Sequence, residues 1–133
     1  MSAKDGMNYA PKGKPSAVVG PGEFRFAAMR LDHGHIYGMC NGLIEAGAEL
    51  KWVYDADPAK VDQFLKQYPG VRAAESEEQI LDDAEVQLVA AAAIPNLRGP
   101  LGVRVMRAGK HYFTDKTPFT TLEQLADARA AAE

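Results

Sequence analysis

Residues 24–40 read FRFAAMRLDHGHIYGMC, and this stretch decides the fold. It opens with a short, mostly apolar run, residues 24–31, as expected of a strand buried in a parallel sheet. The segment Asp32-His33-Gly34-His35 breaks this pattern, and Gly47 later provides a typical helix end. Between them, apolar side chains recur at helical spacing, at Ile36, Met39, Cys40, Leu43 and Ile44. The stretch therefore predicts a strand, a tight turn and a helix.

The same alternation continues to the end of the chain. Further strands are expected at residues 50–54, 71–74, 85–94 and 111–114. The helices between and after them are expected at residues 57–68, at 76–82, from Gly99 or Pro100 to Ala108, and from Thr121 onward. Strands that alternate with helices in this way predict the α/β class. We expect a single-domain, Rossmann-like, doubly wound parallel sheet with helices on both faces.

Composition excludes several classes of protein. The chain has 133 residues, of which 47% are hydrophobic, and this suits one core better than two domains. The formal net charge of -3 gives no basic surface for nucleic acid. No apolar run reaches the roughly 18–20 residues of a membrane span. Cys40 is the single cysteine, so we expect a reducing, cytoplasmic setting.

Two regions are expected along the chain. Residues 1–22 are rich in Pro, Gly, Ser and Lys, and we expect a flexible N-terminal arm there. Residues 23–133 would form the α/β domain. The helix that starts at Thr121 has no stop signal before Glu133, and a doubly wound sheet continues with a sixth strand. We therefore expect a domain cut before its final strand.

Candidate ligand-binding residues follow the strands, because such sheets bind ligands at the carboxyl ends of their strands. The turn at residues 32–38 leads into a helix N-terminus, which favours an anion such as a pyrophosphate. Asp55 follows the second strand about 20 residues after Gly34, the offset of an acid that bonds a ribose hydroxyl. The remaining candidates follow the later strands, at Pro95-Asn96 and at residues 115–118.

Each candidate also has a purely structural interpretation. Asp55 could only cap a turn, and Gly34 and Gly38 could serve the backbone alone. Asp115 and Lys116 could be a solvated ion pair. The metal-ligating residue types His33, His35, Cys40 and His111 match no zinc spacing, so no metal is expected.

Three segments resemble one family of oxidoreductases. They are VYDADPAKVDQF at 53–64, EVQLVAAAAIPN at 85–96 and MRAGKHYFTDKTPFTTLEQL at 106–125. Together with the first strand, residues 24–133 resemble the N-terminal domain of the Gfo/Idh/MocA family. That family comprises NAD(P)-dependent dehydrogenases of sugars, polyols and inositols. The third segment is the most specific, because it resembles the family signature A-G-K-x-V-x-x-E-K-P.

The resemblance implies a role for each candidate residue. Gly34 would be the middle glycine of the phosphate loop, with His35 and Ile36 following it toward the cofactor. Asp55 would hold the adenosine ribose, and its carboxylate favours NAD over NADP. The nicotinamide side would be lined by Ile94, Pro95 and Asn96. Asp115 and Lys116 would occupy the E-K of the signature, which makes Lys116 the candidate catalytic residue beside the substrate hydroxyl.

The chain departs from the family pattern at three places. Asp32 stands where the first glycine of the loop is expected, and it would repel a pyrophosphate unless it turned away to cap the helix. Tyr37 takes the place of the third glycine, where bulk hinders helix–strand packing. Thr117 replaces the proline of E-K-P, and Pro118 follows it.

The leading hypothesis is therefore hydride transfer between nicotinamide and a sugar, polyol or inositol-type hydroxyl. In this family a second domain binds the small-molecule substrate, so this chain alone would bind the dinucleotide without turnover. The alternative is a non-catalytic module that keeps the fold and either senses a nucleotide or serves an interaction. Assembly into a homo-oligomer stays open.

Overall fold

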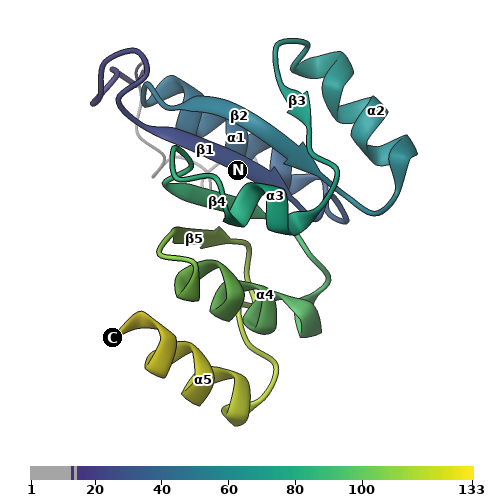
Figure 1. The fold of residues 1–133 in the computed structure, drawn as a ribbon, viewed down its shortest axis with the longest axis vertical. Coiled ribbons are helices and arrows are strands. Elements are labelled where there is room, and N and C mark those ends of the chain that lie inside the picture. Colours follow the sequence, from purple (N-terminus) through teal and green to yellow (C-terminus); the bar gives the residue numbers. More distant parts are fainter. Residues whose placement is uncertain (1–12, 14) are drawn as a thin grey trace, which may run out of the picture.

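Five strands alternate with five helices in residue 13 and residues 15–133, which the computed structural model describes. The elements are β1 Arg25–Met29, α1 His35–Glu45, β2 Glu49–Tyr54, α2 Pro58–Gln67, β3 Arg72–Ala73, α3 Glu77–Leu81, β4 Leu88–Ala91, α4 Pro95–Arg107, β5 His111–Thr114 and α5 Leu122–Ala132. The strands form one sheet in the order β3-β2-β1-β4-β5, and all pairings are parallel (Figure 1). The predicted fold class is confirmed.

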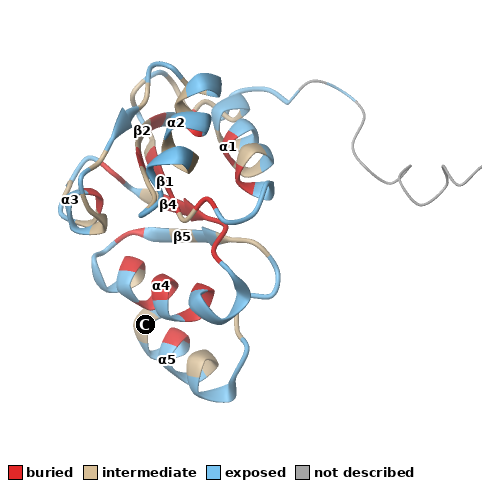
Figure 2. Cartoon of the chain, turned by 90° about the vertical axis from the view of Figure 1, so that its right-hand side faces the viewer, coloured by how far each residue is buried: buried red, intermediate tan, exposed pale blue. Residues whose placement is uncertain are grey.

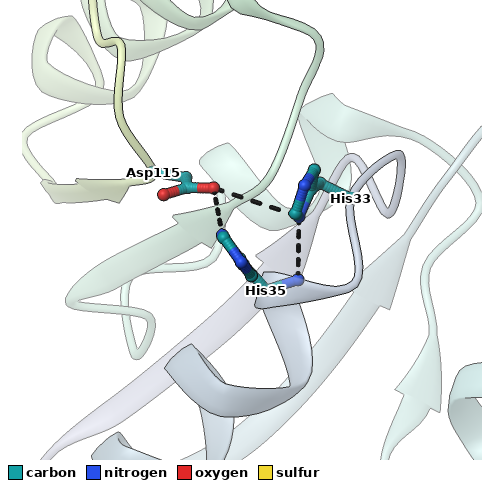
Figure 3. Close-up of side chains that lie close together, drawn as sticks. All are labelled: His33, His35 and Asp115. Atoms are coloured by element: carbon teal, nitrogen blue, oxygen red, sulfur yellow. Dashed lines mark hydrogen bonds and ion pairs between the residues drawn. The ribbon is translucent and has the colours of Figure 1, made fainter. Parts of the chain in front are cut away.

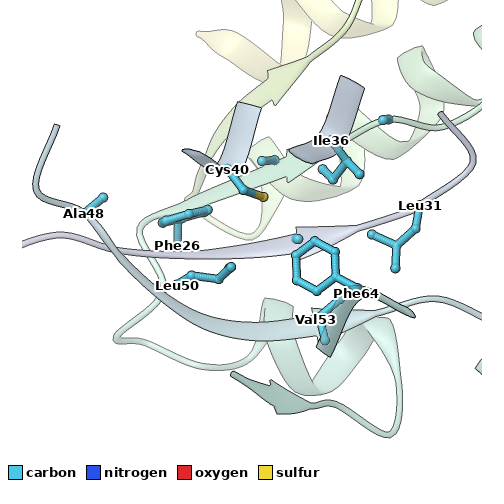
Figure 4. Close-up of a cluster of buried hydrophobic side chains, with 11 residues drawn as sticks. Phe26, Leu31, Ile36, Cys40, Ala48, Leu50, Val53 and Phe64 are labelled. Atoms are coloured by element: carbon cyan, nitrogen blue, oxygen red, sulfur yellow. The ribbon is translucent and has the colours of Figure 1, made fainter. Parts of the chain in front are cut away.

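The sheet is covered on both faces because β1 is apolar on both sides. Phe26 lies in a buried cluster with Ile36 and Cys40 of α1 and Phe64 of α2 (Figure 4). Ala28 belongs to the same cluster. The alternate residues of β1 belong to a second cluster, which includes residues of α3 and α4: Ala27, Met29, Ile80, Leu101 and Val105. Buried residues accordingly concentrate in β1, in β4 and on one side of α4 (Figure 2).

The boundary between β4 and α4 differs from the prediction. The strand is only Leu88–Ala91, and the helix begins at Pro95 rather than at Gly99 or Pro100. Proline fits the first helical position because its missing N–H has no partner there. Pro100 then lies inside the helix and leaves the Asn96 carbonyl without its usual donor. Gln124 of α5 supplies one, because its Nε2 donates to that carbonyl at 3.0 Å.

The predicted arm lies mostly outside the described residues. In its described part, the backbone N–H of Val18 donates to the Ala46 carbonyl at 2.8 Å. Gly47 has a φ of +104°, and a Cβ added there would lie 2.4 Å from the Val19 carbonyl oxygen. The predicted helix end at Gly47 is therefore confirmed, and it is also a contact point for the arm. The arm, the domain boundary and the sixth strand stay predictions.

None of the helices in the described part of the chain is long and apolar enough to cross a membrane.

Candidate functional site

The predicted site residues follow β1, β2, β4 and β5 at the carboxyl edge of the sheet. β1 and β4 are neighbours in the sheet. The chain continues from β1 to β2 on one side and from β4 to β5 on the other, so the switch point of the sheet lies between β1 and β4. The chain leaves β1 through Arg30, whose φ of +54° is unusual for a residue other than glycine. Two backbone hydrogen bonds hold Arg30 there: its N–H donates to the Tyr54 carbonyl, and its carbonyl accepts from the N–H of Ala92. The turn that carries Gly34 starts from this fixed point.

Gly34 is the N-cap residue of α1 and, as a glycine, has no side chain that could cap the helix. A Cβ added to Gly34 would meet nothing within 4 Å, so the protein itself does not require a glycine here. In the described α1 the first turn has no acidic residue to balance the positive end of the helix dipole. The start of α1 thus combines open space with a field that attracts anions.

Asp32 is bonded to α2 rather than to the N-terminus of α1, so it does not cap that helix. Its Oδ1 accepts a hydrogen bond from Lys60 Nζ of α2 at 2.7 Å. This bond raises the pKa of Lys60 above its ordinary value. The carboxylate at the first-glycine position is therefore paired with a cation, which reduces its repulsion of an anion at the loop.

Tyr37 avoids the crowding expected at the third-glycine position. Its ring lies 5.7 Å from that of Phe64 and 6.3 Å from that of Tyr68, both belonging to the α2 region. The sheet-facing positions of α1 are taken by Ile36 and Cys40 instead. Burial raises the pKa of the Cys40 thiol to about 12, so it stays a protonated packing group.

Asp55 makes two hydrogen bonds with the backbone. Its Oδ2 accepts from the N–H of Leu31 at 2.7 Å, and its Oδ1 accepts from the N–H of Asp57 at 2.8 Å. Asp55 therefore caps the turn, as the structural interpretation predicted. Its two hydrogen bonds link the ends of β1 and β2. Each carboxylate oxygen retains a further lone pair, so a ribose hydroxyl could still be bound. A groove of about 390 Å³ lies beside Asp55.

His35 and Asp115 are 80 residues apart in sequence and meet across the carboxyl edge (Figure 3). His35 Nδ1 lies 2.6 Å from Asp115 Oδ2, and His33 Nδ1 lies 4.0 Å from the same oxygen. His33 Nδ1 also accepts from the backbone N–H of His35 at 3.1 Å. The hydrogen bond with His35 is the main cause that lowers the pKa of Asp115, so the carboxylate accepts and His35 Nδ1 donates.

Arg98 is a residue of this region that the sequence patterns did not single out. It is only 3% exposed, and its Nε donates to the Ala93 carbonyl at 2.6 Å. Its Nη1 donates to the carbonyl of Lys116, and it also reaches that of Thr117 at 3.4 Å. The buried guanidinium therefore holds the loop after β5 against the end of β4. α4 also carries Arg104 and Arg107, so no pattern in its sequence set Arg98 apart as the buried arginine.

The other predicted residues lie at the surface of this edge. Ile94 is the N-cap residue of α4, and its side chain is 49% exposed. Pro95 and Asn96 follow it in the first turn and are also exposed. Lys116 is exposed as well, although its backbone is held by Arg98. The structure thus places the candidates along one edge, and a side-chain hydrogen bond joins two of them, His35 and Asp115.

A parallel sheet in the order 3-2-1-4-5, with these loops beside its switch point, defines a Rossmann-type dinucleotide-binding domain. Residues 16–133 match the model of the Gfo/Idh/MocA family, described as an oxidoreductase family with an NAD-binding Rossmann fold. The chain belongs to this family, as its sequence resemblance indicated.

Solved structures agree with this assignment. An oxidoreductase from Erwinia carotovora atroseptica is 46% identical, with a TM-score of 0.79 over 82% of this chain and 33% of its own length. The WlbA dehydrogenase from Chromobacterium violaceum, in complex with NADH and UDP-GlcNAcA, is 26% identical, with a TM-score of 0.71 over 86% and 34%. GenD2 from gentamicin A biosynthesis, in complex with NAD, is 21% identical and has the same fold, with a TM-score of 0.74 over 92% and 34%.

The chain spans about a third of the length of each of these three proteins. A comparison with curated proteins found no match.

Proposed function

We propose that this chain is the NAD-binding part of an oxidoreductase that transfers a hydride between nicotinamide and a sugar, polyol or inositol-type hydroxyl. The proposal is carried by the open N-terminus of α1 at the switch point. Asp55 flanks it after β2, and Asp115 and Lys116 flank it after β5. This layout suits a dinucleotide that crosses the carboxyl edge of the sheet. The NAD and NADH in the GenD2 and WlbA structures support it.

The phosphate loop fits a pyrophosphate. The space over Gly34 lets an anion approach the backbone, and the dipole of α1 favours its charge. His35 and Ile36 follow in the first helical turn, and their N–H groups lie at its positive end. Lys60 pairs with Asp32 and so balances the carboxylate that stands at the start of this loop.

The adenosine side favours NAD over NADP. The groove beside Asp55 is also lined by Asp62 and Glu75, so three carboxylates surround it. A ribose with two free hydroxyls can donate to Asp55, whereas a 2′-phosphate would meet negative charge. Lys60, the nearby cation, already bonds Asp32.

In this proposal the nicotinamide side is formed by Ile94, Pro95 and Asn96 together with Asp115 and Lys116, whose loop Arg98 ties to the end of β4. The exposed apolar surface of Ile94 suits contact with an aromatic ring. Bound nicotinamide supplies the hydride chemistry, and the ammonium of Lys116 would donate a hydrogen bond to the substrate oxygen. Arg98 fixes the Lys116 backbone, so Lys116 explores a limited region. We infer that the chain alone binds the dinucleotide without turnover.

Titration calorimetry of residues 1–133 with NAD, NADP and ADP tests the proposal. We expect NAD to bind more tightly than NADP, and Asp55→Ala to weaken NAD binding by more than about tenfold. Asp127→Ala, in α5 and remote from the loop, is the matched control. Circular dichroism checks that each variant is folded at the titration temperature.

Two results would contradict the proposal. Binding of none of the three nucleotides would favour the interaction module over the NAD-binding domain. Oxidation of a polyol by this chain with NAD would leave the assignment to the family intact but would overturn the inference that it has no turnover alone.

A further inference from the structure

Two histidines and one aspartate form a cluster at the carboxyl edge of the sheet. His33 comes from the β1–α1 turn, His35 is the first residue of α1, and Asp115 comes from the loop after β5 (Figure 3). One potential ligand atom of each residue lies within 4.8 Å of those of the other two. The spacing of these residues along the sequence does not reveal the cluster, because Asp115 lies 80 residues after His35.

Backbone hydrogen bonds hold the cluster in place. The Oδ1 of Asp115 accepts from the N–H of Lys116 at 2.8 Å, which leaves Oδ2 directed at the imidazoles. The N–H of His33 donates to the Ala92 carbonyl at 3.1 Å and so fixes the turn over the end of β4. Supporting bonds of this kind orient ligands in metal sites.

The cluster is open to solution on its histidine side. The side chains of His33 and His35 are 50% and 54% exposed, whereas that of Asp115 is 14% exposed. An ion could therefore enter over the imidazoles, with the carboxylate beneath them as the anionic ligand. A groove of about 470 Å³, lined in part by Gly34, His35 and Asp115, adjoins the cluster and leaves room for a further ligand.

We propose that His33, His35 and Asp115 bind one divalent transition-metal ion, with Zn²⁺ as the best match. Two imidazole nitrogens and one carboxylate oxygen suit Zn²⁺, whereas Mg²⁺ and Ca²⁺ prefer oxygen ligands alone. Three protein ligands leave the fourth tetrahedral position to water or to an added ligand. The proposal goes beyond the function proposed above and does not rest on it.

Metal binding requires two small changes at the cluster. To bind through Nδ1, His33 would give up the hydrogen bond that this nitrogen accepts from the N–H of His35 at 3.1 Å. The hydrogen between His35 Nδ1 and Asp115 Oδ2 would leave as a proton, because a metal takes up the lone pair of the imidazole nitrogen. The two atoms would then move apart from 2.6 Å to about 3.3 Å, the spacing of tetrahedral ligands with bonds of about 2.0–2.1 Å. Exposed imidazole rings can make these adjustments.

The test is calorimetric titration of metal-free residues 1–133 with ZnCl₂. We expect one ion per chain, and a loss of affinity greater than about tenfold for each of His33→Ala, His35→Ala and Asp115→Ala, since even supporting residues change metal affinity by about 10–100-fold. His111→Ala is the matched control, because His111 is the remaining histidine and lies exposed at the start of β5, outside the cluster.

Zn²⁺ binding that survives all three substitutions would overturn the proposal, as would no binding by the unaltered chain. Equal loss in His111→Ala would also overturn it. Circular dichroism shows whether each variant is folded, and His33→Gln replaces any His33→Ala sample that is not. Visible absorption of the Co²⁺-loaded chain gives a second readout, since its ligand-field bands should change in the three variants and stay unchanged in His111→Ala.

Discussion

Arg98 Nε donates a hydrogen bond to the carbonyl of Ala93 at 2.6 Å, and the other end of the same guanidinium reaches the carbonyl of Lys116. One buried side chain thus connects the end of β4 to the loop after β5. Because Arg98 is 3% exposed, water cannot replace these hydrogen bonds if the guanidinium is removed. The position of the candidate catalytic lysine therefore depends on a residue of α4.

Arg98→Met should lower the free energy of unfolding by roughly 2–4 kcal/mol, because it leaves the buried carbonyl of Ala93 and the part-buried carbonyl of Lys116 without a charged donor. Urea unfolding, followed by circular dichroism, measures this change. Arg107→Met is the control: Arg107 is exposed in the last turn of α4, and its loss should change stability by less than about 0.5 kcal/mol. If Arg98→Met and Arg107→Met change the free energy of unfolding equally, the hydrogen bonds of Arg98 do not stabilise the fold.

The sequence predicted the fold because its signals were local. The apolar run of β1, the turn at Gly34 and the proline after Asp57 each depend on nearby residues, and each appears in the structure. The start of α4 was misplaced because Pro95 and Pro100 are both compatible with a first helical turn. Only the tertiary contact between Gln124 and the Asn96 carbonyl explains how Pro100 fits inside the helix.

The candidate site was less predictable because its contacts join distant segments. Lys60 neutralises Asp32 from another helix, and Asp115 meets His35 across the sheet edge. No spacing rule specifies which side chains will meet across such an edge. The phosphate-loop residues could be placed by pattern, whereas their partners required the three-dimensional arrangement.

Asp83 should make stability depend on acid pH. Burial alone would raise its pKa, but hydrogen bonds from Lys51 and Trp52 outweigh this effect and lower the pKa to about 2. A carboxyl group whose pKa is lower in the folded than in the unfolded state stabilises the folded protein when it is ionised. For Asp83 this contribution is present at pH values above its unfolded pKa of 3.8, and it disappears as the pH falls through about 2. The contribution of Asp83 should therefore be complete above about pH 4.

Fluorescence of Trp52, the single tryptophan, can follow unfolding at each pH. Asp83→Asn should be less stable than the unaltered chain at pH 7 by about 1–3 kcal/mol, and the difference should shrink between pH 4 and pH 2. A difference that stays constant over this range would show that the charge of Asp83 is not responsible.

Lys60 should matter for nucleotide binding through Asp32 alone. Lys60→Met leaves the Asp32 carboxylate without its partner beside the phosphate loop, so NAD affinity should fall roughly three- to tenfold. The double variant Asp32→Asn/Lys60→Met removes both charges and should restore most of the affinity. If calorimetry shows no restoration, Lys60 contacts the nucleotide directly instead of acting through Asp32.

Gly34→Ala should separate cofactor binding from folding. A Cβ at Gly34 meets nothing within 4 Å, and the residue has a φ of -60°, which alanine adopts readily. Stability should therefore change by less than about 0.5 kcal/mol. The methyl group would nevertheless occupy the space through which a pyrophosphate approaches the backbone, so NAD affinity should fall by more than about tenfold.

Two other glycines provide the controls for this prediction. Gly42→Ala lies within α1 with open space around it, so it should stabilise the fold by about 0.5–1 kcal/mol and leave NAD affinity unchanged. At Gly102, an added Cβ would approach the Tyr112 ring to 2.4 Å, so Gly102→Ala should destabilise the fold by roughly 1–3 kcal/mol. If Gly34→Ala binds NAD as tightly as Gly42→Ala does, the pyrophosphate does not approach the backbone at Gly34 and must bind elsewhere.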